Sequence, residues 1–188
     1  PAVPHDVEYL QTFTVSRKEI YQTLDTFQNC YDMMEGDMDA GRCYELQMEI
    51  YYLKGRTLNR DGKREKGLIY AEKLIGLAGR AGDERMLLYG YIEALCYGVK
   101  AEDSALMKRY LCLVKEMKNL SYYQPEYGSI LRLESYCHIL DGEYETAEEL
   151  LNKSIEIFSR PRLKNTYFYP AAGAYDYLAI TYRCRGQY

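Results

Sequence analysis

Apolar side chains recur along most of the chain every three or four residues, and polar side chains occupy the positions between them. In the first such segment the apolar residues, separated by 4, 3, 4 and 3 positions, are Ile20, Leu24, Phe27, Tyr31 and Met34. This spacing places them on one face of an α-helix. Ser16 and Glu19 have the spacing of a capping box, in which each side chain bonds to the other residue's backbone. We therefore predict a helix over residues 16–36.

The same period predicts seven further helices. They cover about residues 43–61, 63–79, 84–100, 106–120, 125–140 and 144–159, with an eighth helix after Pro170 that runs to about Arg185. Pro125 fits a first helical turn, where its missing N–H would have no partner. No segment alternates with the period of two that a half-buried strand requires. Most connections are two to six residues long, which is typical of antiparallel helical neighbours.

Three turns repeat along the chain. Asp61-Gly62, Asp141-Gly142 and Arg185-Gly186 each follow a predicted helix, and their glycines are 80 and 44 residues apart. A degenerate turn near Lys100 would divide the longer interval in two. The repeat would then be a helical hairpin of about 38 to 44 residues.

The residues of these hairpins resemble the tetratricopeptide repeat family. Tyr175-Asp-Tyr-Leu-Ala-Ile-Thr-Tyr-Arg-Cys-Arg-Gly-Gln-Tyr188 matches the first half of the family's pattern, and Gly142-Glu-Tyr-Glu-Thr-Ala-Glu-Glu-Leu-Leu-Asn-Lys-Ser154 matches the second. Small residues at Ala147, Ser154 and Ala179 would let neighbouring helices approach closely. The resemblance implies an all-α fold, a right-handed superhelix of antiparallel helical hairpins. The usual tetratricopeptide repeat has a period of about 34 residues, and the period here is longer. Armadillo-like or HEAT-like hairpins therefore remain the structural alternative.

We interpret residues 1–188 as a single domain of this kind. Its hairpins would lie at about 43–79, 84–120, 125–159 and 166–188, the last incomplete, after an unpaired helix at 16–36. A natural array would normally end in a polar capping helix. We therefore expect the chain to be a piece of a longer protein.

The long repeat also resembles the repeat arm of MalT-like regulators, in the LuxR group of bacterial transcription factors. That resemblance implies a cytoplasmic arm that senses an effector or partner, between an ATPase and a helix-turn-helix domain. The sequence has no phosphate-binding Gly-x-x-x-x-Gly-Lys-Ser/Thr and no helix-turn-helix.

Composition narrows the function further. Lys and Arg total 24 against 28 Asp and Glu, a balance that does not favour direct binding to nucleic acid. No apolar stretch approaches a membrane span, and Pro1 to Leu10 do not read as a signal peptide. The six cysteines include no Cys-x-x-Cys, so we expect six small buried hydrophobes in a reducing cytosol. Neither histidine has a ligand spacing, and we predict no metal and no cofactor.

No catalytic constellation emerges. Cys137 and His138 are adjacent, so on a helix they point about 100° apart and make a poor nucleophile–base pair. Paired acids such as Glu148 and Glu149, or Asp25 and Asp32, fall on solvated faces. We predict that the chain is not an enzyme.

The composition is unusual in its 22 tyrosines, against 4 Phe and no Trp. Most of the tyrosines would pack between repeats with their hydroxyl groups in contact with water, and others could line a groove. In the tetratricopeptide family the first helices form the concave surface. Aligning on the glycine turns gives these groove positions: Tyr52, Arg56, Asn59, Tyr97, Arg132, Tyr136, Asp176 and Arg183. Such a set is typical of recognition hot spots, where Tyr stacks and Arg pairs with acids.

We therefore expect a binding or sensor module for a protein segment or a small effector. The alternative is an assembly scaffold that self-associates through its repeat ends, as a homo-oligomer.

Overall fold

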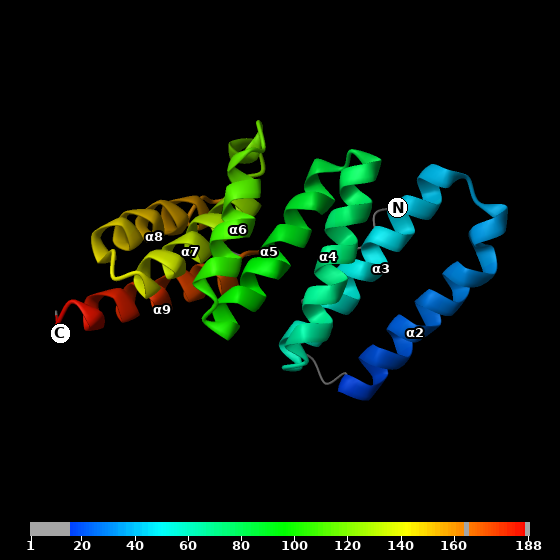
Figure 1. Cartoon of the computed structure of the whole chain (residues 1–188), viewed down its shortest axis with the longest axis horizontal. Coiled ribbons are helices and arrows are strands. Elements are labelled where there is room, and N and C mark those ends of the chain that lie inside the picture. The colour runs from blue at the N-terminus through cyan, green and yellow to red at the C-terminus, as the bar shows by residue number, and fades with distance from the viewer. Residues whose placement is uncertain (1–15, 164–165, 187–188) are drawn as a thin grey trace.

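The computed structural model describes residues 16–163 and 166–186. These residues form eight α-helices and no strand (Figure 1). The helices are α2 (Arg17–Met34), α3 (Ala40–Arg60), α4 (Arg64–Ala81), α5 (Glu84–Ala101), α6 (Ser104–Lys115), α7 (Gln124–Leu140), α8 (Tyr144–Phe158) and α9 (Phe168–Cys184), with short 3₁₀ turns η1 (Glu35–Asp37) and η2 (Leu120–Tyr122). The predicted all-α fold class is confirmed.

Local chemistry explains where the helices begin. The capping box at α2 is present: the Ser16 hydroxyl accepts from the Glu19 backbone N–H, and the Glu19 carboxylate accepts from the Ser16 N–H at 2.7 Å. Aspartates cap three other helices by accepting from the N–H three residues on; they are Asp39, Asp83 and Asp103. Each satisfies one of the donors that a helix start leaves unpaired.

Two boundaries differ from the predictions. α6 ends at Lys115 rather than near Leu120, because the chain turns there and both Met117 and Leu120 pack onto the core between α5, α6 and α7. α9 begins at Phe168, before Pro170. A proline is compatible with a first helical turn, so it does not mark the start of the helix.

The helices pack in two layers. α3, α5, α7 and α9 contact one another in order and form an inner row, while α4, α6 and α8 each bridge two members of that row. α2 lies against α3 at one end of the array, and α8 and α9 lie at the other (Figure 1). Each helix thus packs on its neighbours in sequence, an arrangement compatible with a helical repeat.

Left-handed backbone recurs after each of the inner helices α3, α5, α7 and α9, and it also occurs at Gly82 after α4. Gly62, Gly142 and Gly186 have φ values of 76°, 78° and 72°, and Glu102 takes the same conformation at 53°. At the first three of these turns (62, 102 and 142) the next residue donates a backbone hydrogen bond to the carbonyl five residues before it, as Asp103 does to Gly98. The degenerate turn predicted near Lys100 is confirmed at Glu102. The turn residues are therefore spaced by 40, 40 and 44 positions.

Small residues permit close helix packing at two of the three expected sites. Ala147 and Ser154 on α8 are fully buried, and the Ser154 hydroxyl donates to the Gly128 carbonyl on α7 at 2.7 Å. The expectation for Ala179 is wrong, because it lies on an exposed face of α9, whose described neighbours are α7 and α8.

The expectation that all six cysteines are buried is also wrong. Cys137 is buried and Cys43 and Cys96 are partly buried. The other three lie on the outward faces of α2, α6 and α9 and are exposed: Cys30, Cys112 and Cys184.

Candidate binding groove

A cavity of about 570 Å³ opens along the inner row of helices. Its lining comes from α3, α5, α7 and residues 166–170, and we call it the groove. Four of the predicted site residues line it: Tyr52, Arg56 and Asn59 from α3, and Arg132 from α7. The structure thus brings together side chains that are up to 80 residues apart in sequence.

The other four predicted residues lie outside the groove lining. Tyr97 is partly buried on α5. Tyr136 packs its ring on Tyr177 of α9, with centroids 4.9 Å apart. Asp176 and Arg183 are exposed on α9. Of the predicted set, only the first four therefore belong to the lining of this cavity.

The groove lining from α5 includes Tyr89, Glu93 and Lys100 but not Tyr97. Its other two members, Ile92 and Cys96, lie ten and six residues before the turn at Glu102, as Tyr52 and Arg56 do before Gly62. Aligning on the glycine turns gave Tyr97 instead of its neighbour Cys96, because this turn has Glu102 in place of a glycine.

The end of the connection from α8 to α9 and the first turn of α9 supply groove residues that the sequence analysis did not assign. Tyr167 lies in the lining at the end of the connection, and Tyr169 and Pro170 lie in it from the first turn of α9; the Tyr167 ring stacks near Phe158 with centroids 6.2 Å apart. The connection is longer than those after α3, α4, α5 and α7, and aromatic residues follow one another at its junction with α9, which is the signal that could have indicated this role.

Two carboxylates are buried in the groove wall. Glu93 and Glu126 have only 8% and 6% of their surface exposed. Glu93 accepts a hydrogen bond from the Asn59 side-chain amide at 3.0 Å, and Glu126 faces the Arg85 guanidinium at 3.7 Å. Each buried charge thus has a partner, as burial requires.

Asn59 is a positioning residue. Its amide nitrogen faces Glu93 on α5, while its side-chain oxygen lies against Gly67 on α4, where any added Cβ would overlap it. The Asn59 backbone carbonyl accepts from the Lys100 ammonium at 2.9 Å. This residue therefore joins three helices and fixes the floor of the groove.

The tyrosine rings form a second part of the lining. Tyr52 and Tyr89 stack with centroids 5.0 Å apart and an angle of 21° between the rings. Arg56 donates to the Tyr52 hydroxyl at 2.6 Å and Arg85 donates to the Tyr89 hydroxyl at 3.2 Å. Burial, with the nearby Glu126 carboxylate, raises the pKa of Tyr89 well above its usual value. Tyr89 is therefore a neutral hydroxyl at physiological pH.

Arg132 has a different environment from the other cations. Its guanidinium lies over the Tyr177 ring, 5.3 Å from the centroid. Its Nε is buried without a hydrogen-bond partner, and no carboxylate within residues 16–163 and 166–186 forms an ion pair with it. Arg132 thus brings a charged donor to the groove wall and has no acid to neutralise it in the described chain.

Positive charge exceeds negative charge in the lining. Four cations, Arg56, Arg60, Lys100 and Arg132, accompany the two buried glutamates. Cys96 lies among them, and burial, followed by the Glu93 charge, raises the pKa of its thiol. A thiol with a raised pKa is a weak nucleophile at neutral pH, so the groove offers binding groups and no activated sulfur.

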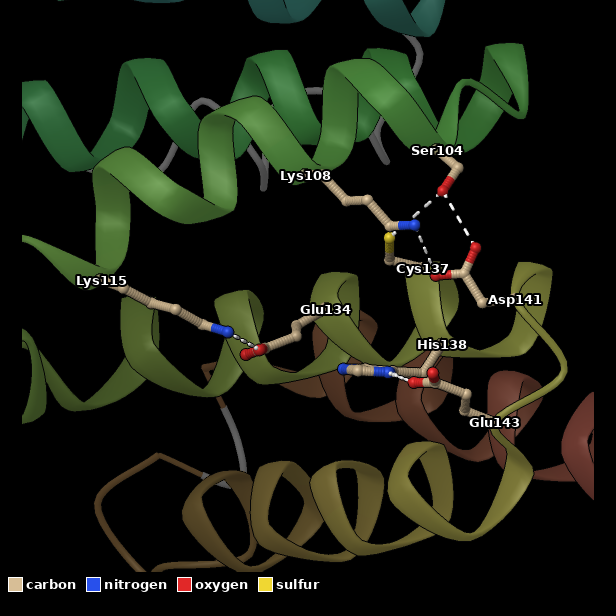
Figure 2. Close-up of polar contacts among 8 residues, drawn as sticks. All are labelled: Ser104, Lys108, Lys115, Glu134, Cys137, His138, Asp141 and Glu143. Atoms are coloured by element: carbon tan, nitrogen blue, oxygen red, sulfur yellow. Dashed lines mark hydrogen bonds and ion pairs between the residues drawn. The ribbon is translucent and has the colours of Figure 1, made fainter.

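A polar cluster joins α6 to α7 away from the groove (Figure 2). Lys108 pairs with Asp141 at 2.9 Å, and the Ser104 hydroxyl lies 3.7 Å from the Cys137 sulfur. His138 pairs with Glu143 at 2.5 Å and is directed away from Cys137 (Figure 2). Burial raises the pKa of the Cys137 thiol. The cluster therefore stabilises the helix contact and does not align a nucleophile with a base.

Within the part of the chain that the structure describes, no three His, Cys, Asp or Glu side chains gather as metal ligands would. Nor does any described helix have the length and apolar character needed to cross a membrane.

No protein-family model, curated protein or solved structure matches this chain. The functional argument therefore depends on the groove itself.

Proposed function

We propose that the chain is a non-catalytic binding module whose groove recognises an acidic segment of another protein. The observation that carries the proposal is Arg132, a charged donor in the groove wall without a carboxylate partner among the described residues. An arginine in this situation gains most from a ligand carboxylate, because the fork of N–H donors matches two carboxylate oxygens.

The rest of the lining supports an acidic ligand. The surplus of cations over buried glutamates favours negative charge, and partial enclosure strengthens each charge interaction relative to water. Stacked tyrosines offer flat faces for apolar parts of the ligand. The volume lies in the range of ligand sites, so a small acidic effector would use the same groups.

The wider setting is proposed from the resemblance of the repeats. We place the hairpins in the tetratricopeptide-like class and the module in the sensor arm of a cytoplasmic, MalT-like bacterial regulator of transcription. The 40-residue spacing of the turn residues supports long repeats of this kind. Reading the coding sequence on both sides tests this setting, which requires an ATPase before the module and a helix-turn-helix after it.

A second candidate function is assembly through the ends of the array. Large apolar side chains are exposed at both ends, with Phe27 and Met33 on α2 at 53% and 83%, and Phe168 and Tyr175 on α9 at 64% and 55%. Exposed apolar side chains that lie together favour contacts with other proteins. Sedimentation equilibrium over a hundredfold concentration range tests this function, which requires reversible self-association without ligand.

Binding of a hexaglutamate peptide tests the leading proposal. We expect hexaglutamate to bind at least tenfold more tightly than hexalysine, and Arg132→Ala to weaken hexaglutamate binding about tenfold. The control is Arg80→Ala, which removes the same charge from the exposed face of α4, outside the groove lining. Equal loss in both variants, or no preference between the peptides, contradicts the proposal.

A further inference from the structure

A second hollow lies on the outer layer, where α6 ends early. α6 has 12 residues, whereas the outer helices α4 and α8 have 18 and 15. After α6 the chain passes through η2 to α7, and a cavity of about 390 Å³ opens between this segment and α8. The cavity shares no lining residue with the groove, so what it binds is independent of the proposed function.

The floor of this outer cavity is apolar. Leu111 and Val114 from α6 and Ile130 and Leu131 from α7 are each at most 6% exposed. Partly buried walls come from Met117, Leu120 and Leu150. A hydrocarbon chain lying here would meet the methyl and methylene groups of these three side chains and would lose part of its contact with water.

The rim of the outer cavity is cationic. Lys115 pairs with the almost buried Glu134 at 2.6 Å, so these two charges offset each other (Figure 2). Lys118, in the segment after α6, and Lys153, on α8, are exposed. Neither forms an ion pair with any described residue. Two ammonium groups thus border an apolar floor without compensating acids.

We propose that the outer cavity binds a single-chain anionic amphiphile, of which a medium-chain fatty carboxylate is the simplest. The hydrocarbon chain lies against Met117, Leu120 and Leu150, and the head group lies between Lys118 and Lys153. An acidic helix would offer the same charge, but the volume of the hollow is that of a small-molecule site. The shortened α6 has therefore created a ligand site between two outer helices.

Isothermal titration calorimetry tests this site, with dodecanoate kept below its micelle concentration. We expect saturable 1:1 binding, about tenfold weaker for decanoate because two methylenes are lost, and at least tenfold weaker for dodecyltrimethylammonium. The double variant Lys118→Glu with Lys153→Glu should weaken dodecanoate binding at least tenfold. The matched control is Lys18→Glu with Lys66→Glu, which changes two exposed lysines elsewhere.

Three results would overturn the proposal. One is absence of saturable binding by dodecanoate to the wild-type chain. Another is a result that shows unspecific partition of the amphiphile into the protein. Such a result would be equal affinity for the cationic and anionic amphiphiles, or an equal loss of dodecanoate affinity in the two double variants. The third is displacement of dodecanoate by hexaglutamate, which would place an acidic peptide rather than an amphiphile in the outer cavity. Because Arg132 lines only the groove, its variant should bind dodecanoate unchanged, so the two proposals can fail separately.

Discussion

The side-chain amide of Asn59 on α3 donates a hydrogen bond to the carboxylate of Glu93 on α5 at 3.0 Å, with both residues at least nine-tenths buried. The bond joins the first helices of two successive hairpins. Glu93 also lines the groove, so one contact both ties the repeats together and sets the charge of the binding surface.

Removal of this amide should destabilise the fold. Asn59→Ala leaves the Glu93 carboxylate buried without its donor, which costs about 1–3 kcal/mol of unfolding free energy. Urea denaturation, monitored by circular dichroism, measures this loss of unfolding free energy. Asn152→Ala, on the exposed face of α8, is the matched control and should change stability by less than about 0.5 kcal/mol. Similar losses in the two variants would show that the Asn59–Glu93 bond contributes little.

Two glycines of α4 should respond oppositely to the same substitution. A Cβ on Gly67 would overlap the Asn59 side chain, so Gly67→Ala should destabilise by about 1–3 kcal/mol. A Cβ on Gly76 meets nothing within 4 Å, so Gly76→Ala should stabilise the helix by about 0.5–1 kcal/mol. Thermal unfolding of both variants measures the difference. A stabilised Gly67→Ala would show that α3 and α4 are less closely packed than described.

Much of the fold follows from sequence periodicity, for a physical reason. A helix that buries one face must place apolar residues every three or four positions, so the pattern locates each of α2 to α9, with ends that differ from the structure by up to five residues. The end of α6 could not be obtained in this way. Met117 and Leu120 keep the helical spacing, but Met117 reaches the core from the irregular segment after α6 and Leu120 from the 3₁₀ turn η2, rather than from a continued helix.

The turn at Glu102 carries strain that glycine would remove. Glu102 has φ 53°, a conformation in which a Cβ is crowded by the backbone. We expect Glu102→Gly to stabilise the chain by about 0.5–1 kcal/mol, since the relief of strain exceeds the added entropy of the unfolded chain. Gly142→Ala, at the equivalent turn, should destabilise the chain by about 1 kcal/mol because it introduces the same crowding. Chemical denaturation of the pair measures both signs; a destabilised Glu102→Gly would mean that the Glu102 side chain outweighs the strain.

Stability should fall in alkali. Burial, with the Glu72 carboxylate that the hydroxyl contacts at 2.9 Å, raises the pKa of Tyr110 to about 12, and burial likewise raises the pKa of Tyr31 to about 12. The unfolded tyrosines ionise near pH 10, so between pH 10 and 12 unfolding releases protons. The stabilisation is complete below pH 10 and is lost as the pH rises through 12.

Unfolding midpoints in urea, measured from pH 8 to pH 11, test this dependence. The midpoint should decline above about pH 10, and Tyr110→Phe should decline less steeply because one titrating group is gone. Parallel curves for the two chains would exclude Tyr110 as a source of the decline.

The groove was only partly accessible to sequence reasoning. Tyr52, Arg56, Asn59 and Arg132 lie at fixed distances before a glycine turn and do line the cavity, but Tyr136, Asp176 and Arg183 lie at the same distances before their turns and do not. Cys96 was missed because Glu102 replaces that glycine. Tyr167 was missed because its place depends on how the connection before α9 folds back on the inner row, which helical periodicity does not encode.

The most direct test of the binding proposal is nuclear magnetic resonance of the Arg132 side chain. The Nε–H resonance, assigned by its loss in Arg132→Lys, should shift during titration with hexaglutamate and stay unchanged with hexalysine. The Arg80 Nε–H, on the exposed face of α4, serves as an internal reference and should not move beyond the effect of added salt. A shift confined to Arg132 and its groove neighbours is the result that the account predicts. An unchanged Arg132, or equal shifts at Arg132 and Arg80, would contradict it.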